Sequence, residues 1–318
     1  MKKAIIIGAG GIAKHLAVRL ESQGITVYSV GRNQAVQFSG LLEAEKPHAV
    51  FLTISTLDKG EAARDYILTC IKARIPVITC EKGALAYHAK TLKPHLGKIG
   101  FSATVGGGTR MLKYVAGRHL ANKQVEISAV VNGTLNFIFD EIRRGGRSLG
   151  EACKEACKLG YAEPGATDPL SLINGELKDV RMKTCVFFNT ILAIDRIVTP
   201  DELGLLEQTA PDLEQLNEEG GDYRLVVSFS NHKQTKEHPR FGKRFKLHFV
   251  DGWHITGSFR QITQASQLSS WLPGGVGNAV HIIEGELGSG GKYTLSGPGA
   301  GHEPTTSAML ADFEELTK

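Results

Sequence analysis

A chain of 318 residues, 42% of them hydrophobic and 22% charged, has a globular composition, and its length suits two domains. The net charge of +4 comes without a lysine and arginine tract, so we expect an anionic cofactor or substrate and no nucleic-acid partner. The first apolar run breaks at Gly8, too early for a signal peptide or a membrane span. Five scattered cysteines predict reduced thiols and a cytoplasmic protein.

The start of the chain predicts a dinucleotide-binding unit. A β-branched run from Lys3 to Ile7 precedes the turn Gly8 to Ala13, and a helical stretch from Lys14 to Glu21 follows. In this order of strand, glycine turn and helix, the backbone approaches a pyrophosphate at the helix N-terminus. A tight turn without a ligand is the alternative. The expected cofactor-binding residues of this turn are Gly8, Gly10, Gly11 and Ile12.

The cofactor is predicted to be NADP(H) from the residues after the second expected strand, Ile25 to Val30. An NAD site usually carries an acidic residue there for the ribose hydroxyls, whereas this chain has Gly31, Arg32 and Asn33. The Arg32 guanidinium, with Asn33 beside it, can bind the 2′-phosphate of NADP. NAD(H) is the alternative if Arg32 is only solvated.

More strands continue this unit. They are expected over Ala49 to Ser55, Pro76 to Cys80 and Phe101 to Val105, with a helix over Glu61 to Arg74. Because ligands bind at the carboxyl ends of parallel strands, Ser55, Thr56 and Lys82 are expected beside the cofactor. Gly106 to Gly108 lack side chains, which indicates that their backbone lies close to another group.

The pattern changes from about Val125. Polar-alternating segments between Asp222 and Phe259 predict a second sheet. Gly299 and Gly301 precede a last helix and are expected to approach the cofactor from the far side. The elements expected here are a strand over Val125 to Val131, a helix ending at Arg143, a helix over Leu149 to Lys158, strands over Arg224 to Phe229 and Arg244 to Val250, and a helix over Thr305 to Leu316.

These elements predict an α/β fold with a Rossmann-type doubly wound parallel sheet and a second α+β domain. The dinucleotide-binding domain is expected over residues 1–124, completed by the C-terminal helix at 300–318. The catalytic, substrate and dimerisation domain is expected over residues 125–299.

The loop after Gly160 is expected to open the site of chemistry. Prolines and glycine at 164, 165 and 169 interrupt a regular helix, so Tyr161, Glu163 and Asp168 should lie on a loop. Asn174 is expected to cap the helix that follows.

Asp179 and Lys183 are the expected centre of that helix. They are four residues apart and therefore share a helix face, which continues into an apolar stripe. A lysine partly removed from water beside a carboxylate can have a pKa suited to proton transfer. A solvated surface ion pair is the alternative.

Taken together, the motifs resemble those of homoserine dehydrogenase across nearly the whole chain. The resemblance implies interconversion of L-aspartate 4-semialdehyde and L-homoserine by hydride transfer with NAD(P)H, on a small amino-acid substrate, in a homodimer. The motifs are Gly8 to Ala13, Lys82, Val105 to Gly108, Asn132 to Asn136, Gly160 to Pro164, Asp179 with Lys183, Asn278 to Val280, and Gly297 to Gly301.

The resemblance also implies residue roles. Lys82 and Lys183 would be the proton-transfer lysines, Asp179 would orient Lys183, and Glu163 would hold the substrate ammonium. The further substrate-binding residues would be Tyr161, Gly133, Thr134 and Asp168.

Several positions depart from the family pattern. Ser102 stands where the family often has a glutamate for a monovalent cation, so such an ion would be held weakly by the backbone of Val105 and Gly107. Arg110 replaces a proline, Glu81 replaces an asparagine, and the loop before Asp179 is longer. A different amino-acid-like substrate, or a cofactor-binding sensor without catalysis, therefore stays an alternative.

Overall fold

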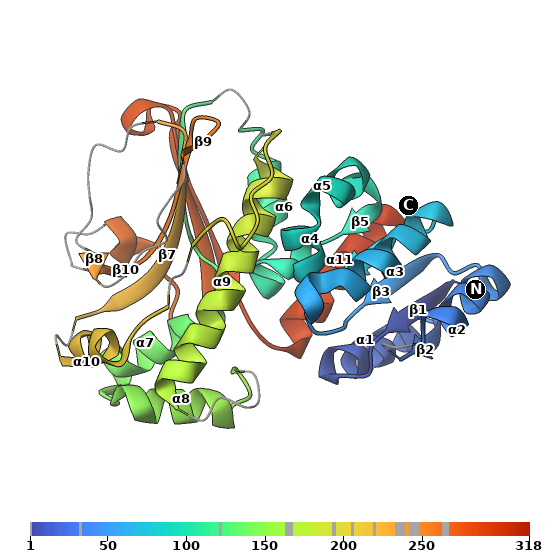
Figure 1. Cartoon of the computed structure of the whole chain (residues 1–318), viewed down its shortest axis with the longest axis horizontal. Helices are drawn as coiled ribbons and strands as arrows, with labels where there is room; N and C mark the ends of the chain where they lie inside the picture. The colour runs from blue at the N-terminus through green and yellow to red at the C-terminus, as the bar shows by residue number, and fades with distance from the viewer. Residues whose placement is uncertain are drawn as a thin grey trace.

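The computed structural model describes residues 2–31, 34–120, 123–162, 168–192, 195–204, 207–218, 221–232, 240–241, 249–262 and 267–318. Within these residues the chain forms two sheets, which lie on either side of a long central helix, α9 (Pro169–Ile191) (Figure 1).

The first sheet is parallel, with the strand order β2-β1-β3-β4-β5. The order reverses between β1 and β3, and the carboxyl ends of these two strands are where a sheet of this type binds its ligand. The strands are β1 (Lys3–Ile7), β2 (Thr26–Val30), β3 (Ala49–Leu52), β4 (Val77–Thr79) and β5 (Ile99–Gly100).

Helices cover both faces of this sheet because successive strand residues point to opposite sides. Ile5 and Ile7 pack towards α2 and α3, whereas Ala4 and Ile6 pack towards α1 and the C-terminal α11. The doubly wound prediction is confirmed. The helices of this half are α1 (Gly11–Ser22), α2 (Ala35–Glu45), α3 (Glu61–Lys72), α4 (Gly83–Tyr87), α5 (Ala89–Leu92) and α11 (His302–Leu316).

The second sheet is antiparallel, with the order β12-β11-β6-β7-β10-β8 and with β9 paired to β10. Its strands are β6 (Val125–Val130), β7 (Tyr223–Ser230), β8 (Arg240–Phe241), β9 (Phe249–Val250), β10 (Trp253–Gln261), β11 (Gly277–Glu284) and β12 (Gly291–Pro298). The remaining helices are α6 (Met111–Ala116), α7 (Gly133–Gly145), α8 (Leu149–Lys158) and α10 (Ala210–Glu218).

Helix α9 packs on the second sheet through aromatic side chains. Phe187 of α9 stacks on Phe229 of β7, with ring centroids 4.7 Å apart, and both side chains are fully buried. Burial of one such side chain contributes about 1.5–3 kcal/mol, so this contact fixes the position of α9 on the sheet. The predicted second α+β unit is therefore present.

Two predicted strands need correction. Residues 101–105 are not a strand, because the N–H and hydroxyl groups of Ser102 donate to Asp312 at 2.8 and 2.6 Å, and the backbone turns into a 3₁₀ helix, η3 (Ser102–Thr104). Most of the predicted strand at 244–250 lies outside the described residues, and its last two residues form β9.

The central helix begins earlier than predicted. Asp168 caps it by accepting a hydrogen bond from the Ser171 N–H at 2.9 Å, and Pro169 takes the first helical position, where its missing N–H costs nothing. The prediction that Asn174 is the cap was wrong. Asn174 lies inside α9, and its amide exchanges hydrogen bonds with the backbone of Gln208 at 3.0 and 2.8 Å.

The predicted domain boundary at residues 124 and 125 stays a prediction. Strands β1 to β5 precede it and β6 to β12 follow it. Helix α11 returns to the first sheet, where Met309 and Phe313 pack with Ile6. No helix within the described ranges is both long and apolar enough to cross a lipid bilayer.

Candidate active site

A carboxylate on α9 joins two lysines. Asp179 Oδ2 lies 2.7 Å from Lys183 Nζ, one turn later on the same helix, and Asp179 Oδ1 lies 2.9 Å from Lys82 Nζ. The three side chains are only 14% to 21% exposed. The structure therefore brings together the three residues predicted to be catalytic, and their roles stay predictions.

The charges of this cluster keep Asp179 ionised. Burial raises the pKa of the Asp179 carboxyl, but the positive charges of Lys183 and Lys82, and the hydrogen bonds that both donate, outweigh burial and hold the pKa well below its ordinary value. A fixed carboxylate of this kind can hold both ammonium groups in place. An ammonium group that is mostly removed from water can stabilise, and protonate, an oxygen that gains negative charge.

Lys82 is positioned by the turn between β4 and α4. Glu81, which is 2% exposed, accepts hydrogen bonds from the first two N–H groups of α4 at 2.6 and 2.9 Å and from the hydroxyl of Thr56. These bonds cap α4 and set the direction in which Lys82 projects. Thr56, predicted to bind cofactor, therefore donates its hydroxyl within the protein, and Ser55 next to it is exposed.

Two residues that the sequence analysis did not assign to the site adjoin this cluster. Asn132 Nδ2 donates to Asp179 Oδ2 at 3.2 Å and to Glu176 Oε2 at 2.6 Å. Asn132 Oδ1 accepts the Leu135 N–H at 2.8 Å as the cap of α7, so its amide has a defined orientation. The sequence signals for them are a polar residue two positions after the end of β6 and a carboxylate three positions before Asp179.

Predicted substrate-binding residues lie at the N-terminus of α7. Gly133 is the first residue of this helix, and the Thr134 hydroxyl donates to the backbone carbonyl of Tyr161 at 2.7 Å. Because Asn132 connects this helix end to the lysine cluster, the structure brings Gly133 and Thr134 beside it, with Tyr161 held by Thr134.

Asp168 lies far from the lysines. It is fifteen residues before Lys183 along α9, which is roughly 20 Å at the rise of an α-helix. Its carboxylate accepts hydrogen bonds from the N–H and hydroxyl groups of Ser171 at 2.9 and 2.7 Å. A small substrate cannot contact both Asp168 and Lys183, so the structure gives Asp168 a capping role. Glu163 lies outside the described residues.

The glycine turn after β1 leads directly into the N-terminus of α1. Gly8 has a φ of +131°, and a Cβ there would lie 2.5 Å from the Thr53 hydroxyl, so glycine is required. Gly10 caps α1, and no atom lies within 4 Å of the position that a Cβ on Gly10 would occupy. Helix α1 starts with Gly11 and Ile12 and has no acidic residue in its first turn. Its free N–H groups and helix dipole fit a pyrophosphate.

The C-terminal glycine segment closes against the glycine run that precedes α6. A Cβ on Gly107, whose φ is +52°, would lie 2.6 Å from the carbonyl oxygen of Gly299. Gly301 caps α11, and the ring of His302 covers Gly11, so the N-termini of α1 and α11 are neighbours. The predicted close backbone approach is confirmed, and contacts of Gly299 and Gly301 with a cofactor stay a prediction.

Near Ser102, a carboxylate is supplied by α11. Asp312, which has no exposed surface, accepts both hydrogen bonds from Ser102, and Arg110 Nη2 lies 3.6 Å from Asp312 and 2.5 Å from Glu315. The Arg110 guanidinium thus faces this carboxylate. No group of three or more His, Cys, Asp and Glu side chains that could hold a metal occurs in the described part of the chain.

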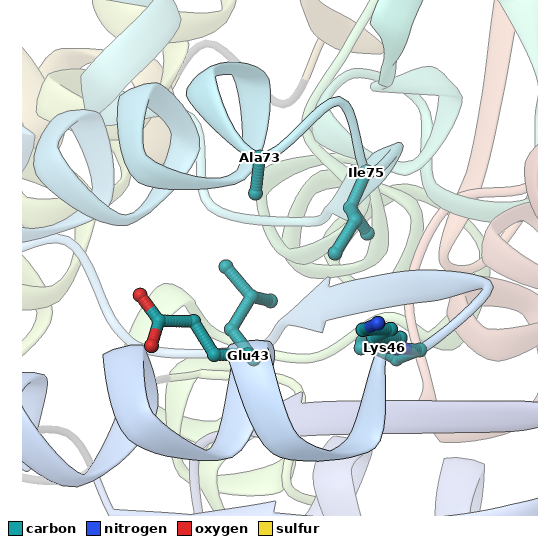
Figure 2. Close-up of a pocket in the computed structure, with 6 residues that line it drawn as sticks. Glu43, Lys46, Ala73 and Ile75 are labelled. Carbon is teal, nitrogen blue, oxygen red and sulfur yellow. The ribbon is translucent and has the colours of Figure 1, made fainter.

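The cofactor-selecting residues Arg32 and Asn33 lie outside the described residues. A separate hollow of about 420 Å³ lies where α2 and α3 end, at the amino ends of β3 and β4, and Figure 2 shows Ala73 and Ile75 facing Glu43 and Lys46 across it. This is the sheet edge opposite to the candidate site, and the hollow contains none of the predicted site residues. Its lining consists of Leu42, Glu43, Lys46, Pro47, Ala73 and Ile75.

Known proteins resemble this chain over most of its length. A model of the homoserine dehydrogenase family matches residues 111–313. The homoserine dehydrogenase of Lactococcus lactis is 25% identical over 294 residues, which cover 90% of this chain and 63% of the relative. An NAD(+)-dependent homoserine dehydrogenase of Pseudomonas canavaninivorans is 26% identical over 262 residues, covering 80% and 66%. The chain thus spans less than two thirds of the length of these curated relatives.

A solved structure shares the fold. The hyperthermophilic archaeal homoserine dehydrogenase in complex with NADPH matches with a TM-score of 0.65 and 21% identity, covering 100% of this chain and 98% of that chain. The two-sheet architecture is therefore one that a solved protein also has.

Proposed function

The chain belongs to the homoserine dehydrogenase family, and we propose that it is an NAD(P)-dependent oxidoreductase that interconverts L-homoserine and L-aspartate 4-semialdehyde. One observation carries the proposal: the Asp179 carboxylate lies between two lysine ammonium groups, at 2.7 Å from Lys183 and 2.9 Å from Lys82. This arrangement provides the proton transfer that must accompany the movement of a hydride to or from carbon.

NADP(H) is the proposed cofactor, and it would supply or accept the hydride when bound. Gly8, Gly10 and Gly11 would hold its pyrophosphate against the N-terminus of α1. One relative is NAD(+)-dependent, while the archaeal structure contains NADPH. The proposed preference for NADP(H) therefore depends on Arg32, which would bind the 2′-phosphate.

In the reductive direction, the carbonyl oxygen of the substrate gains negative charge as its carbon is reduced. Lys183 donates a proton to this oxygen, and Lys82 stabilises the charge from the side of the first sheet. Asp179 holds both ammonium groups, one at each of its carboxylate oxygens. In the oxidative direction the steps reverse. Lys183, in its neutral form, takes the hydroxyl proton as the hydride leaves carbon.

The proposed substrate position lies between the lysines and the N-terminus of α7. The N–H groups of Gly133 and Thr134 in the first turn of α7 cannot form intrahelical hydrogen bonds and can donate to an α-carboxylate. Glu163 would bind the ammonium group of the substrate, and Tyr161 would line the substrate-binding site.

A cytoplasmic homodimer completes the proposal. The five cysteines are free thiols, which supports a reducing compartment. The homodimer follows from the resemblance, and sedimentation analysis of the purified protein tests it.

Oxidation of L-homoserine by the purified protein, with NADP⁺ and NAD⁺ compared, tests the function directly. We expect saturable formation of reduced cofactor, with a higher kcat/KM for NADP⁺. Activity on a different amino alcohol alone would support the altered-substrate alternative, which the departures at Ser102, Arg110 and Glu81 favour. Cofactor binding without turnover of any amino alcohol would support the sensor.

A further inference from the structure

We propose that Glu176 binds the ammonium group of the substrate and thereby selects amino alcohols over alcohols without an amino group. This inference rests on the proposed function and assigns a specificity residue within the same site.

The position of Glu176 is set by Asn132. Because Asn132 Oδ1 caps α7 through Leu135, its Nδ2 must point at the carboxylates, where it donates to Glu176 Oε2 at 2.6 Å and to Asp179 Oδ2 at 3.2 Å. One amide nitrogen thus places the two carboxylates side by side. Glu176 is half-buried, so its charge is held in place while part of the side chain stays accessible.

The spacing along α9 matches the size of the substrate. Glu176 lies three residues before Asp179, a rise of roughly 5 Å, and Lys183 reaches back to Asp179 at 2.7 Å. The hydroxyl and ammonium groups of homoserine are also separated by roughly 5 Å in an extended conformation. A substrate whose oxygen meets Lys183 can therefore place its ammonium group against Glu176.

The charges of the cluster support the same assignment. The Asn132 amide holds the carboxylates of Glu176 and Asp179 side by side. An ammonium group has three donors and binds more than one acceptor. Asp168, predicted as a further substrate-binding residue, lies roughly 20 Å from Lys183 along α9, whereas Asn132 joins Glu176 to Asp179.

The test compares homoserine with 4-hydroxybutyrate, which lacks the ammonium group. Glu176→Gln keeps the shape and an oxygen for the Asn132 bond, but it removes the charge. We expect the KM for homoserine to rise roughly ten- to hundredfold, with a much smaller change in kcat, because a charge-assisted bond in the bound substrate is lost. The kcat/KM ratio of homoserine to 4-hydroxybutyrate should fall by about the same factor.

The matched control is Glu155→Gln, which neutralises a carboxylate on α8 that pairs with Arg147 and Lys158. It should leave both substrates unaffected. Glu176→Asp, with the charge kept, should retain most of the discrimination between the two substrates, and it decides the question if Glu176→Gln does not fold. In that case, a complete loss of the discrimination between the two substrates in Glu176→Asp would count against the inference.

Two results would overturn the inference and leave the proposed function intact. The first is an unchanged kcat/KM ratio in Glu176→Gln. The second is a fall in kcat with an altered pH profile at an unchanged ratio, which would make Glu176 a positioning residue for Asp179. A wild-type protein that oxidises no amino alcohol contradicts the proposed function, and the inference falls with it.

Discussion

Asp179 on α9 lies 2.9 Å from Lys82, which follows β4 of the first sheet, so one ion pair connects the two halves of the molecule at the candidate site. The Asp179 carboxylate also holds Lys183 at 2.7 Å. A substrate bound by the second half would therefore meet a lysine from each half, at the sheet edge where the cofactor is proposed to bind.

The ion pairs of Asp179 should contribute to stability in a pH-dependent way. The pKa of Asp179 is lower in the folded protein than in the unfolded chain, so its ionised form stabilises the fold at any pH above the ordinary aspartate range. This contribution is lost as the pH falls below about 4 towards the folded pKa.

Asp179→Asn should therefore lower the free energy of unfolding at pH 7 by about 1–3 kcal/mol. Urea unfolding of wild type and variant at pH 7 and at about pH 3 measures this, and the difference between the two proteins should be smaller at the acidic pH. A difference that is constant or grows on acidification would contradict the account of Asp179.

Arg32→Glu tests the cofactor preference. If Arg32 binds the 2′-phosphate, this change replaces attraction by repulsion, and the Kd for NADP should rise far more than the Kd for NAD, by roughly a hundredfold or more. Titration of the protein with each cofactor provides the measurement. Equal weakening of both cofactors would remove the argument for NADP(H).

Sodium and potassium should have little effect on activity. Ser102 donates to Asp312 instead of offering a carboxylate, and Arg110 already places a positive charge 3.6 Å from Asp312. Activity measured at constant ionic strength, with sodium or potassium exchanged for a large organic cation, checks this. Strong, saturable activation by either ion would show that the backbone near Val105 binds it.

Much of the fold was accessible from local sequence patterns. The β-branched run at Lys3 to Ile7 and the glycine turn after it predicted a buried parallel strand followed by a helix, and the structure has both. The helix at Leu149 to Lys158 was predicted with its observed bounds, since Ser148 and Glu151 form a capping box at its start. Patterns of this kind depend on neighbours in the chain and can be recognised without the tertiary structure.

The errors arose where distant residues decide the local structure. Ser102 leaves the sheet because Asp312, more than two hundred positions later, accepts its N–H and hydroxyl groups. Asn174 is tolerated inside α9 because its amide bonds to Gln208.

Long-range contacts also explain which part of the candidate site could not be predicted from the sequence. The spacing of four residues predicted the pair of Asp179 and Lys183, whereas the contact of Asp179 with Lys82, 97 positions earlier, depends on how α9 packs against α4. The contact of Asn132 with Glu176 likewise joins the start of α7 to α9. Neither contact has a local pattern in the sequence.

The central claim is that the lysine cluster performs proton transfer, and Lys183→Met tests it most directly. The variant keeps much of the side-chain length and removes the ammonium group. Its matched control is Lys178→Met, which removes an exposed lysine from the same helix. Both proteins are assayed for turnover with homoserine and for the Kd of NADP.

We predict that kcat of Lys183→Met falls by roughly two orders of magnitude or more, the scale of a lost general acid, while the Kd of NADP changes little because the cofactor binds on the first sheet. Lys178→Met should behave like wild type. Near wild-type turnover with homoserine in Lys183→Met would contradict the catalytic role of the cluster and would leave Asp179 and Lys183 as a structural ion pair.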